Sequence, residues 1–477
     1  MATPTVSGGT DVARVLNQRI TWRFTAPIVI DGALIVCAVI ASTALLVSSQ
    51  ETEPSGIAWL VAKVALLAAI CQLCLYYADL YDARSRGNSR ELVVRLTQSL
   101  GVTALVLSAV YAVVPSLMVG RGVFALAVGL ILAFLPVWRA AFDWALGRVA
   151  PSERILMLGT GPAAVSMVRE LLGRQRDLGV EIVGFVEAEP SSRIRAFLPA
   201  PGVLGQVADI PSIVESLRVD RVVVSVDDAR GKLPMDALLD MKLRGVRFDH
   251  LASVFEEYMG RIAVENLRPS WLIFSDGFRK PRTLMVTKRI VDLCAGTVGL
   301  LIGAPLMLSV AVAVKLTSRG PVLYHQTRTG EGGRPFSVHK FRTMRTDAEK
   351  ATGPVWASAN DSRVTRIGGF LRRTRLDELP QLWNILCGNM SLVGPRPERP
   401  EFVEALTDQI PFYGQRHAVK PGLTGWAQVR YTYAASIEDA MEKLQYDLFY
   451  IKNMSTMLDL FIVFSTIKTV LRREGSR

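Results

Sequence analysis

Four long apolar segments in the first third of the chain most constrain how it can fold. They cover residues 26–49, 57–79, 92–115 and 122–144, and each approaches the roughly 20 residues that a helix needs to cross a bilayer. Hydrophobic residues make up 50% of the 477-residue chain, a share that suits a membrane-associated protein of several domains. The pattern therefore predicts a four-helix transmembrane domain at residues 25–148.

The charges around these segments predict their orientation. Residues 1–24 are basic, and so is the loop after the second segment, which contains Arg84 and Arg86. The loop after the first segment contains Glu51 and Glu53 instead. Because basic loops stay on the cytoplasmic side, we expect a cytoplasmic amino-terminal segment and a return to the cytoplasm after the fourth segment.

From Arg154 onward, short buried strands alternate with amphipathic helices, a pattern typical of a doubly wound parallel sheet. We expect a Rossmann-like α/β domain at residues 150–255 and an interdomain junction at residues 256–285. The turn at residues 159–164 reads Gly-Thr-Gly-Pro-Ala-Ala and precedes a helix, where a phosphate could bind. A structural remnant of the fold is the alternative, because Pro162 removes one backbone N–H.

A fifth apolar segment, residues 290–316, opens the remainder of the chain. Two basic residues precede it, and Lys315 and Arg319 close it, so basic residues mark both ends as cytoplasmic. Pro305 lies near the middle and favours a break in the helix. We therefore expect a re-entrant helix that enters one leaflet and returns. A kinked fifth span is the alternative.

The net charge of +12 suits an anionic partner, either lipid headgroups or nucleotide phosphates. We expect no nucleic acid as a partner, because the positive charge is spread among apolar segments. The 5 cysteines are too few and too scattered for a disulfide framework. The 4 histidines are not paired at metal-binding spacing, which argues against a transition-metal site.

Basic residues surround two adjacent acids between positions 363 and 397. Five arginines stand before Asp377 and Glu378 with no acid among them, and a Pro-Arg-Pro sequence around Arg396 follows. Apolar residues repeat at helical spacing after Pro380. The two acids therefore lie just before a helix amino terminus, whose dipole stabilises ionised carboxylates and bound phosphate.

Carboxylates among guanidinium groups suit the handling of phosphate esters with a bound divalent cation. An ionised Asp377 can act as a nucleophile toward phosphorus. Glu378 can hold a Mg²⁺ ion that neutralises a pyrophosphate. Arg372 and Arg396 would donate hydrogen bonds to phosphate. A solvated acid pair beside a basic interfacial helix is the alternative, but it does not explain why the acids and arginines occur together.

At this point the chain resembles the bacterial sugar transferases, or monotopic phosphoglycosyl transferases, in their large multi-domain form. The resemblance covers nearly all of residues 286–471. The matching residues are Lys288, Arg289, 320–322, Gln326, Arg328, Gly330, 340–342, Leu371, Arg372, 376–381, 393–398, Arg416, 420–426, Asp447 and Tyr450. The resemblance implies an α-rich catalytic domain at residues 286–477 that contains the re-entrant helix.

The resemblance also implies a two-step reaction that initiates exopolysaccharide or capsule assembly. Asp377 would attack the sugar-proximal phosphate of a UDP-sugar and release UMP, and polyprenyl (undecaprenyl) phosphate would then accept the phosphosugar. Glu378 matches the family's Mg²⁺-binding acid. The residues expected to bind substrate are Lys340, Arg342, Arg372, Arg396, Arg416 and Asp447. Arg416 could instead face the membrane, and Asp447 could instead cap a helix.

The implied location is the bacterial inner membrane, with the catalytic domain on the cytoplasmic face and in contact with membrane lipid. A homodimer through the spans or the α/β domain is a further expectation. Two other functions stay open. One is a sugar-nucleotide modifying enzyme built on the α/β domain, which lacks a Tyr-x-x-x-Lys pair after the glycine turn. The other is a membrane-tethered nucleotide-binding scaffold.

Overall fold

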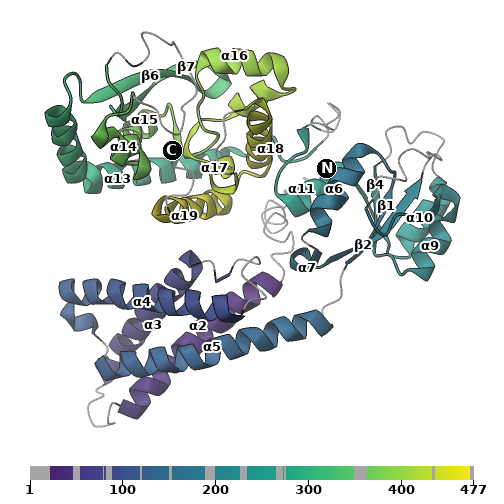
Figure 1. Cartoon of the computed structure of the whole chain (residues 1–477), viewed down its shortest axis with the longest axis horizontal. Helices are drawn as coiled ribbons and strands as arrows, with labels where there is room; N and C mark the ends of the chain where they lie inside the picture. The colour runs from purple at the N-terminus through teal and green to yellow at the C-terminus, as the bar shows by residue number, and fades with distance from the viewer. Residues whose placement is uncertain are drawn as a thin grey trace, which may run out of the picture. The chain divides into compact units, whose positions relative to one another are not determined.

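The computed structural model describes most of the chain, and its elements can be followed in Figure 1. The expected amino-terminal segment lies outside the described residues up to position 21, as do the charged loops after the first two apolar segments and much of the expected junction. The described residues are 22–46, 54–78, 80–81, 89–118, 121–149, 153–173, 175–187, 199–225, 234–264, 272, 275–346, 348, 363–431 and 436–472.

Each of the four expected apolar segments is a long helix. They are α2 (Trp22–Leu46), α3 (Pro54–Tyr77), α4 (Ser89–Val113) and α5 (Arg121–Val149), with a short 3-10 turn η2 (Pro115–Leu117) after α4. Among the described residues, these four and α13 (Arg282–Thr317) are long and apolar enough to cross a membrane. The chain is a membrane protein of mixed α and α/β structure, as expected.

A buried ion pair lies inside the packed helices α2–α5. Helix α2 contacts α3 and α5, and α4 contacts the same two helices. Arg139 of α5 pairs with Asp31 of α2, and its Nε lies 3.2 Å from Asp31 Oδ2. Arg139 also donates to the carbonyl of Leu80. Two opposite charges that are buried together avoid the cost of a single unpaired charge, and the apolar pattern of the sequence did not predict this pair.

A five-stranded sheet with the order β3-β2-β1-β4-β5 follows the apolar helices. The strand order reverses at β1, so the sheet is doubly wound, with α6 on one side and α9 and α10 on the other (Figure 1). The strands are β1 (Glu153–Leu158), β2 (Val180–Glu187), β3 (Val203–Gln206), β4 (Arg221–Val224) and β5 (Arg247–His250). The helical elements are α6 (Pro162–Leu172), α7 (Gln175–Leu178), η3 (Val207–Asp209), α9 (Ile210–Ser216), α10 (Met235–Leu243) and α11 (Leu251–Met259).

The carboxy-terminal part of the chain is rich in helices, with two small sheets. Strands β6 (Leu323–Thr329) and β7 (Pro335–Phe341) pair antiparallel around η5 (Glu331–Gly333), and β8 (Ser391–Val393) pairs in parallel with β9 (Gly422–Thr424). The helical elements are α14 (Arg366–Arg373), η6 (Leu376–Glu378), α15 (Gln381–Cys387), α16 (Pro400–Gln409), η7 (Tyr413–Ala418), α17 (Trp426–Arg430), α18 (Ile437–Asn453) and α19 (Thr456–Arg472).

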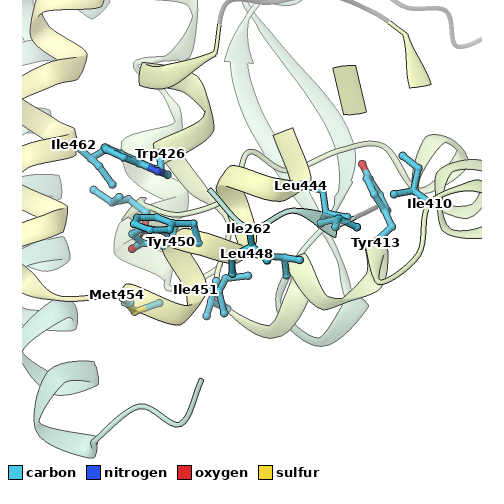
Figure 2. Packing of buried hydrophobic residues seen from close by; sticks show 14 of the residues in the cluster. Ile262, Ile410, Tyr413, Trp426, Leu444, Leu448, Tyr450, Ile451, Met454 and Ile462 are labelled. Atoms are coloured by element: carbon cyan, nitrogen blue, oxygen red, sulfur yellow. Dashed lines mark hydrogen bonds between the residues drawn. The ribbon is translucent and has the colours of Figure 1, made fainter. Parts of the chain in front are cut away.

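Helix α18 is central to the hydrophobic core of this part. Leu444, Leu448 and Tyr450 of α18 are buried and belong to one cluster with Tyr413 and Trp426 (Figure 2). The Ser436 side chain caps the amino end of the helix in a capping box with Asp439. The core therefore fixes α18, and with it the buried polar residues of this helix, such as Asp447.

The core also includes residues of the expected junction. Ile262 is buried in the cluster of Figure 2, and its N–H donates to the carbonyl of Gln445 at 3.1 Å. Glu256 of α11 binds Lys452 Nζ at 2.6 Å and Asn453 Nδ2 at 2.9 Å, both on α18. These described junction residues therefore pack against α18.

Helix α13 is one continuous helical element with Pro305 inside it, whereas we expected two helices separated by a break. Figure 1 shows α13 changing direction part-way along its length. A proline removes one helical hydrogen bond, so a helix can continue past it with a bend. Residues on both sides of Pro305 pack against the same part of the chain: Gly299 lies against Leu382, and Val314 against Phe341.

Candidate active site

The two adjacent acids lie in the 3-10 turn η6, directly before α15 as expected. Asp377 and Glu378 are buried, with 8% exposure each. The turn is held by Leu376 and Leu379, which pack with Leu371 of α14 against the carboxyl half of α13. Apolar residues on either side of the acids therefore fix the turn and bury two carboxyl groups that need charged partners.

Three cationic groups converge on one oxygen of Glu378. Glu378 Oε1 lies 2.6 Å from Arg396 Nη2, 3.4 Å from Lys340 Nζ and 3.7 Å from Arg375 Nη1. Burial alone would raise the pKa of this carboxyl, but the charges of Arg396 and Lys340 outweigh burial and hold the pKa well below its usual range. Glu378 is therefore a permanent anion.

Asp377 has a different environment, although it is the next residue. Among the described residues, none donates a hydrogen bond to its carboxylate. Burial raises the pKa of Asp377 to about 6, and the charge of Glu378 acts in the same direction. The nearby charges of Lys340 and Arg372 partly oppose this rise in pKa. The result is a carboxylate that cations attract but no donor occupies, as a nucleophile requires.

Strand β7 positions Lys340. The N–H of His339 donates to Asn384 Oδ1 at 3.1 Å, and Asn384 Nδ2 donates to the carbonyl of Ser337 at 2.7 Å. Asn384 belongs to α15, so this side chain fastens β7 to the helix that follows the two acids. Lys340 therefore reaches Glu378 from a fixed strand, and burial lowers the pKa of Lys340 while Glu378 raises it.

The Pro-Arg-Pro loop that carries Arg396 is anchored by the β8–β9 pair. Gly394 N donates to the carbonyl of Thr424, and Gly422 N donates to that of Pro395, both at 2.9 Å. A Cβ at Gly422 would lie 2.1 Å from Gly394 N, so only glycine fits between these backbones. The glycines of residues 420–426 therefore allow the close approach that presents Arg396 to the acids.

Arg416 and Asp447 form a buried ion pair behind this loop. Arg416 Nη2 donates to Asp447 Oδ2 at 2.8 Å and to the carbonyl of Arg396 at 3.1 Å, and Nη1 donates to the Tyr413 hydroxyl at 2.6 Å. Burial raises the pKa of Asp447 to about 6, against the charge of Arg416. Substrate binding by these two residues stays a prediction, but their contacts position the backbone of Arg396.

The remaining two residues that we expected to bind substrate are Arg372 and Arg342. Arg372 Nε donates to Thr343 Oγ1 at 2.9 Å, and its charge lowers the pKa of Asp377. Arg342 is directed elsewhere: it donates to the carbonyls of Ser318 and Arg319 at 2.9 and 2.6 Å. Those two residues directly follow α13, so Arg342 holds the chain where it leaves that helix. The expected contact of Arg342 with substrate stays a prediction.

Comparison with known proteins indicates the family to which this chain belongs. Residues 283–473 match the family model of bacterial sugar transferases, and residues 77–231 match a model described as a CoA-binding domain. An Aeromonas hydrophila UDP-N-acetylgalactosamine-undecaprenyl-phosphate N-acetylgalactosaminephosphotransferase is 41% identical over 55% of this chain and 61% of its own length. Two proteins named UDP-glucose:undecaprenyl-phosphate glucose-1-phosphate transferase are also similar. That of Xanthomonas campestris is 34% identical over 68% of this chain, and that of Escherichia coli is 33% identical over 66%, each across 67% of the relative.

The chain belongs to the bacterial sugar transferase family. The matched region of the family model contains η6, α15, the Pro-Arg-Pro loop and α18, which together form the site described above. The chain spans 61% of the Aeromonas relative.

Two cationic residues of the site were not predicted from the sequence. Arg375 contacts Glu378 and adopts a left-handed backbone with φ 59°, which turns the chain from α14 into η6. Lys443 lies close to Glu398, Arg396 and Arg416, and burial lowers its pKa. Lys443 stands four residues before Asp447, so the two share one face of α18, a spacing that could have indicated it.

The two acids of the site fit one type of metal ion. No group of three or more His, Cys, Asp or Glu side chains comes together within the described residues, so they form no complete protein-only metal site. Each ion pair of Glu378 in that part of the chain ends at Oε1, which leaves Oε2 available. One or two carboxylates completed by substrate phosphates are typical of Mg²⁺, so Glu378 fits this ion.

Proposed function

We propose that this protein transfers a sugar 1-phosphate from a UDP-sugar to undecaprenyl phosphate and releases UMP, the step that initiates exopolysaccharide assembly. The observation that carries the proposal is Asp377, a buried carboxylate that accepts no hydrogen bond from any described residue and stands next to Glu378, whose Oε1 is paired with cations. The names of the three relatives support UDP-sugars and undecaprenyl phosphate as the substrates.

In the first step, an Asp377 carboxylate oxygen attacks the phosphorus next to the sugar. A new bond forms between that oxygen and phosphorus, the bond from phosphorus to the UMP oxygen breaks, and UMP leaves with the electron pair. Lys340 and Arg396 lie beside the acids and would neutralise the charge that develops on the phosphate oxygens. The product is a phosphosugar joined covalently to the enzyme.

In the second step, an oxygen of undecaprenyl phosphate attacks the same phosphorus. The bond to Asp377 breaks, the free carboxylate returns, and the product is undecaprenyl diphosphate-sugar. A carboxylate is a good leaving group here because Lys340 and Arg372 stabilise its negative charge. Splitting the transfer into two displacements lets the same cationic site handle a soluble donor and a lipid acceptor in turn.

Glu378, through Oε2, would hold Mg²⁺ together with phosphate oxygens of the donor. When bound, the ion neutralises the pyrophosphate and makes UMP a better leaving group. We expect EDTA to abolish turnover and added Mg²⁺ to restore it, measured as UMP release. Turnover that persists in EDTA would remove Glu378 from this role.

The proposed function is tested by a UMP-release assay of the purified protein with a panel of UDP-sugars and undecaprenyl phosphate. We expect UMP to form with at least one sugar, and labelled sugar phosphate to enter the lipid. Release of UDP alone would indicate ordinary glycosyl transfer instead. No nucleotide release with any sugar would favour a scaffold.

We further propose that α13 is re-entrant and that the catalytic part faces the cytoplasm at the inner membrane. The exposed side chains around the bend are apolar: Leu301, Ile302 and Leu306 are all exposed. Val310 and Val314, beyond the bend, are buried against the catalytic part. An apolar apex between two packed halves suits a helix that enters one leaflet and returns.

The expected homodimer also stays a proposal. Mass photometry of the protein in detergent or nanodiscs would give its mass directly, and a single-chain mass would contradict the dimer.

A further inference from the structure

Two cationic side chains meet at the carboxyl end of α15, away from the acids. Arg289 of α13 donates from Nη1 to the carbonyl of Ile385 at 2.7 Å and from Nη2 to that of Leu386 at 2.8 Å. A Cβ on Gly388, the residue that ends α15, would lie 3.4 Å from Arg289 Nη2 and 3.7 Å from Lys420 Nζ. The two positive charges therefore approach the same glycine.

The carbonyls at the end of α15 are hydrogen-bond partners of Arg289 but not of Lys420. A cation at the carboxyl end of a helix is stabilised by its last carbonyls, and Arg289 binds two of them. Lys420 has three N–H donors, yet it makes no hydrogen bond or ion pair with any described residue. Neither cation has a carboxylate partner among those residues. Two neighbouring like charges without a counter-ion repel each other, so an anion bound between them would stabilise both.

Exposed apolar side chains occur on α13 and α15, the two helices that pack together next to this pair of cations. Ile290, directly after Arg289, is 56% exposed, and Leu293, one turn further along α13, is 39% exposed. Trp383 of α15, 55% exposed, precedes Gly388 by five residues. Tryptophan beside basic residues and exposed aliphatic side chains is the composition of a membrane interface, where apolar groups enter the bilayer and cations meet its headgroups.

We propose that Arg289 and Lys420 bind the phosphate of an anionic phospholipid headgroup, while Ile290, Leu293 and Trp383 contact its acyl chains. This inference rests on the membrane seating of α13 proposed above. A phosphate at this place cannot react at Asp377, because α15 lies between them and its seven residues span about 10 Å. The site therefore suits a bulk lipid, which would hold the carboxyl end of α15 at the membrane surface, more than the lipid substrate.

The test compares Lys420→Gln with Lys242→Gln in the full chain, reconstituted in nanodiscs of phosphatidylcholine with or without phosphatidylglycerol. Lys242 is an exposed lysine of α10, so its substitution makes the same change in net charge. Native mass spectrometry counts the phosphatidylglycerol molecules that stay on the ejected protein. We expect Lys420→Gln to lower this retention about fivefold, the weight of one basic residue near an anionic surface, and Lys242→Gln to leave it unchanged.

A third variant and two outcomes decide the proposal. Lys420→Arg, which keeps the positive charge, should retain phosphatidylglycerol as the parent does. Equal retention in Lys420→Gln and Lys242→Gln would overturn the proposal. An increased KM for undecaprenyl phosphate in Lys420→Gln, without a change in retention, would overturn it too and would assign the cations to the lipid substrate. The proposed function is tested separately by UMP release in nanodiscs of phosphatidylcholine alone. If the parent protein released no UMP there, the proposed function would fail, but the measurement of phosphatidylglycerol retention would still decide the lipid site.

Discussion

Asp377 and Glu378 are neighbours in one turn, yet their carboxyl groups have different surroundings. Glu378 Oε1 forms ion pairs with Arg396 Nη2 at 2.6 Å and with Lys340 Nζ at 3.4 Å, and these charges keep Glu378 ionised. Asp377 accepts no hydrogen bond from the described residues and has a raised pKa. Two acids whose environments separate their pKa values commonly have separate tasks, which supports the proposed role of Asp377 as the nucleophile.

The nucleophile assignment predicts the behaviour of Asp377→Asn. An amide cannot form the acyl-phosphate bond, so we expect UMP release to fall by at least about 1,000-fold, as when a nucleophile is removed from other enzymes. Mass spectrometry of the quenched parent, incubated with donor but without lipid, should show a sugar-phosphate increment at this residue. The variant should show none. A variant with full activity would remove Asp377 from the mechanism.

The raised pKa predicts the pH dependence of the reaction. Asp377 attacks only when ionised, and because its pKa is about 6, kcat/KM should fall as the pH drops below about 6. The negative charge of Glu378 contributes to the rise in pKa, so Glu378→Gln should move this acid limb to lower pH in the remaining activity. A pH–rate profile of both proteins tests the shift. An unchanged limb would mean that another group titrates there.

At the scale of elements, α18 supports the Pro-Arg-Pro loop through one ion pair. Asp447 binds Arg416, and Arg416 holds the carbonyl of Arg396. Asp447→Asn leaves the buried charge of Arg416 uncompensated, so we expect a loss of about 3–5 kcal/mol in the free energy of unfolding, together with lower kcat. Thermal unfolding and UMP release measure the two effects.

An apolar replacement of the same pair separates stability from positioning. The double variant Arg416→Met/Asp447→Leu should regain most of the lost stability, because two apolar groups replace two buried charges. It should stay less active than the parent, since the carbonyl of Arg396 has lost its donor. Full activity in this stable double variant would show that the ion pair does not position the loop.

Helix α13 connects the expected membrane-facing surface with the site. Lys288 binds the carbonyl of Val393 at 2.8 Å and Asp459 Oδ2 at 2.7 Å, both buried. Asp292 accepts from Ser391 Oγ at 3.0 Å and from Leu392 N at 2.8 Å. The amino half of α13 therefore holds β8, the strand that leads into the Pro-Arg-Pro loop, so α13 and this loop form one packed unit.

At the scale of the whole molecule, the proposed re-entrant form of α13 predicts the side of the membrane on which residue 477 lies. Four spans and one re-entrant helix place residues 148 and 477 on the same side, whereas a fifth span places them on opposite sides. We expect reporter fusions after these two positions to give cytoplasmic signals in both cases. Opposite signals would refute the re-entrant helix and would put the site away from cytoplasmic UDP-sugars.

Local sequence patterns determined much of this protein. Each of the apolar segments is a helix, the alternation after Arg154 is a doubly wound sheet, and Asp377 and Glu378 stand before α15 as their surroundings indicated. Such features depend on periodicity and on residues close in sequence, so they can be read without the fold. The family resemblance of residues 286–471 was specific for the same reason, since its motifs are contiguous.

Tertiary structure alone decided which distant residues meet. Sequence could not show that Arg342 binds the carbonyls that follow α13, that Arg416 pairs with Asp447, or that Lys443 lies in the same region. The sequence also could not show that α13 bends at Pro305 and does not break. Whether the helix continues past Pro305 depends on how its two halves pack against the rest of the catalytic part. These contacts join side chains that are tens of residues apart, and their free energy exists only once the core has brought the elements together.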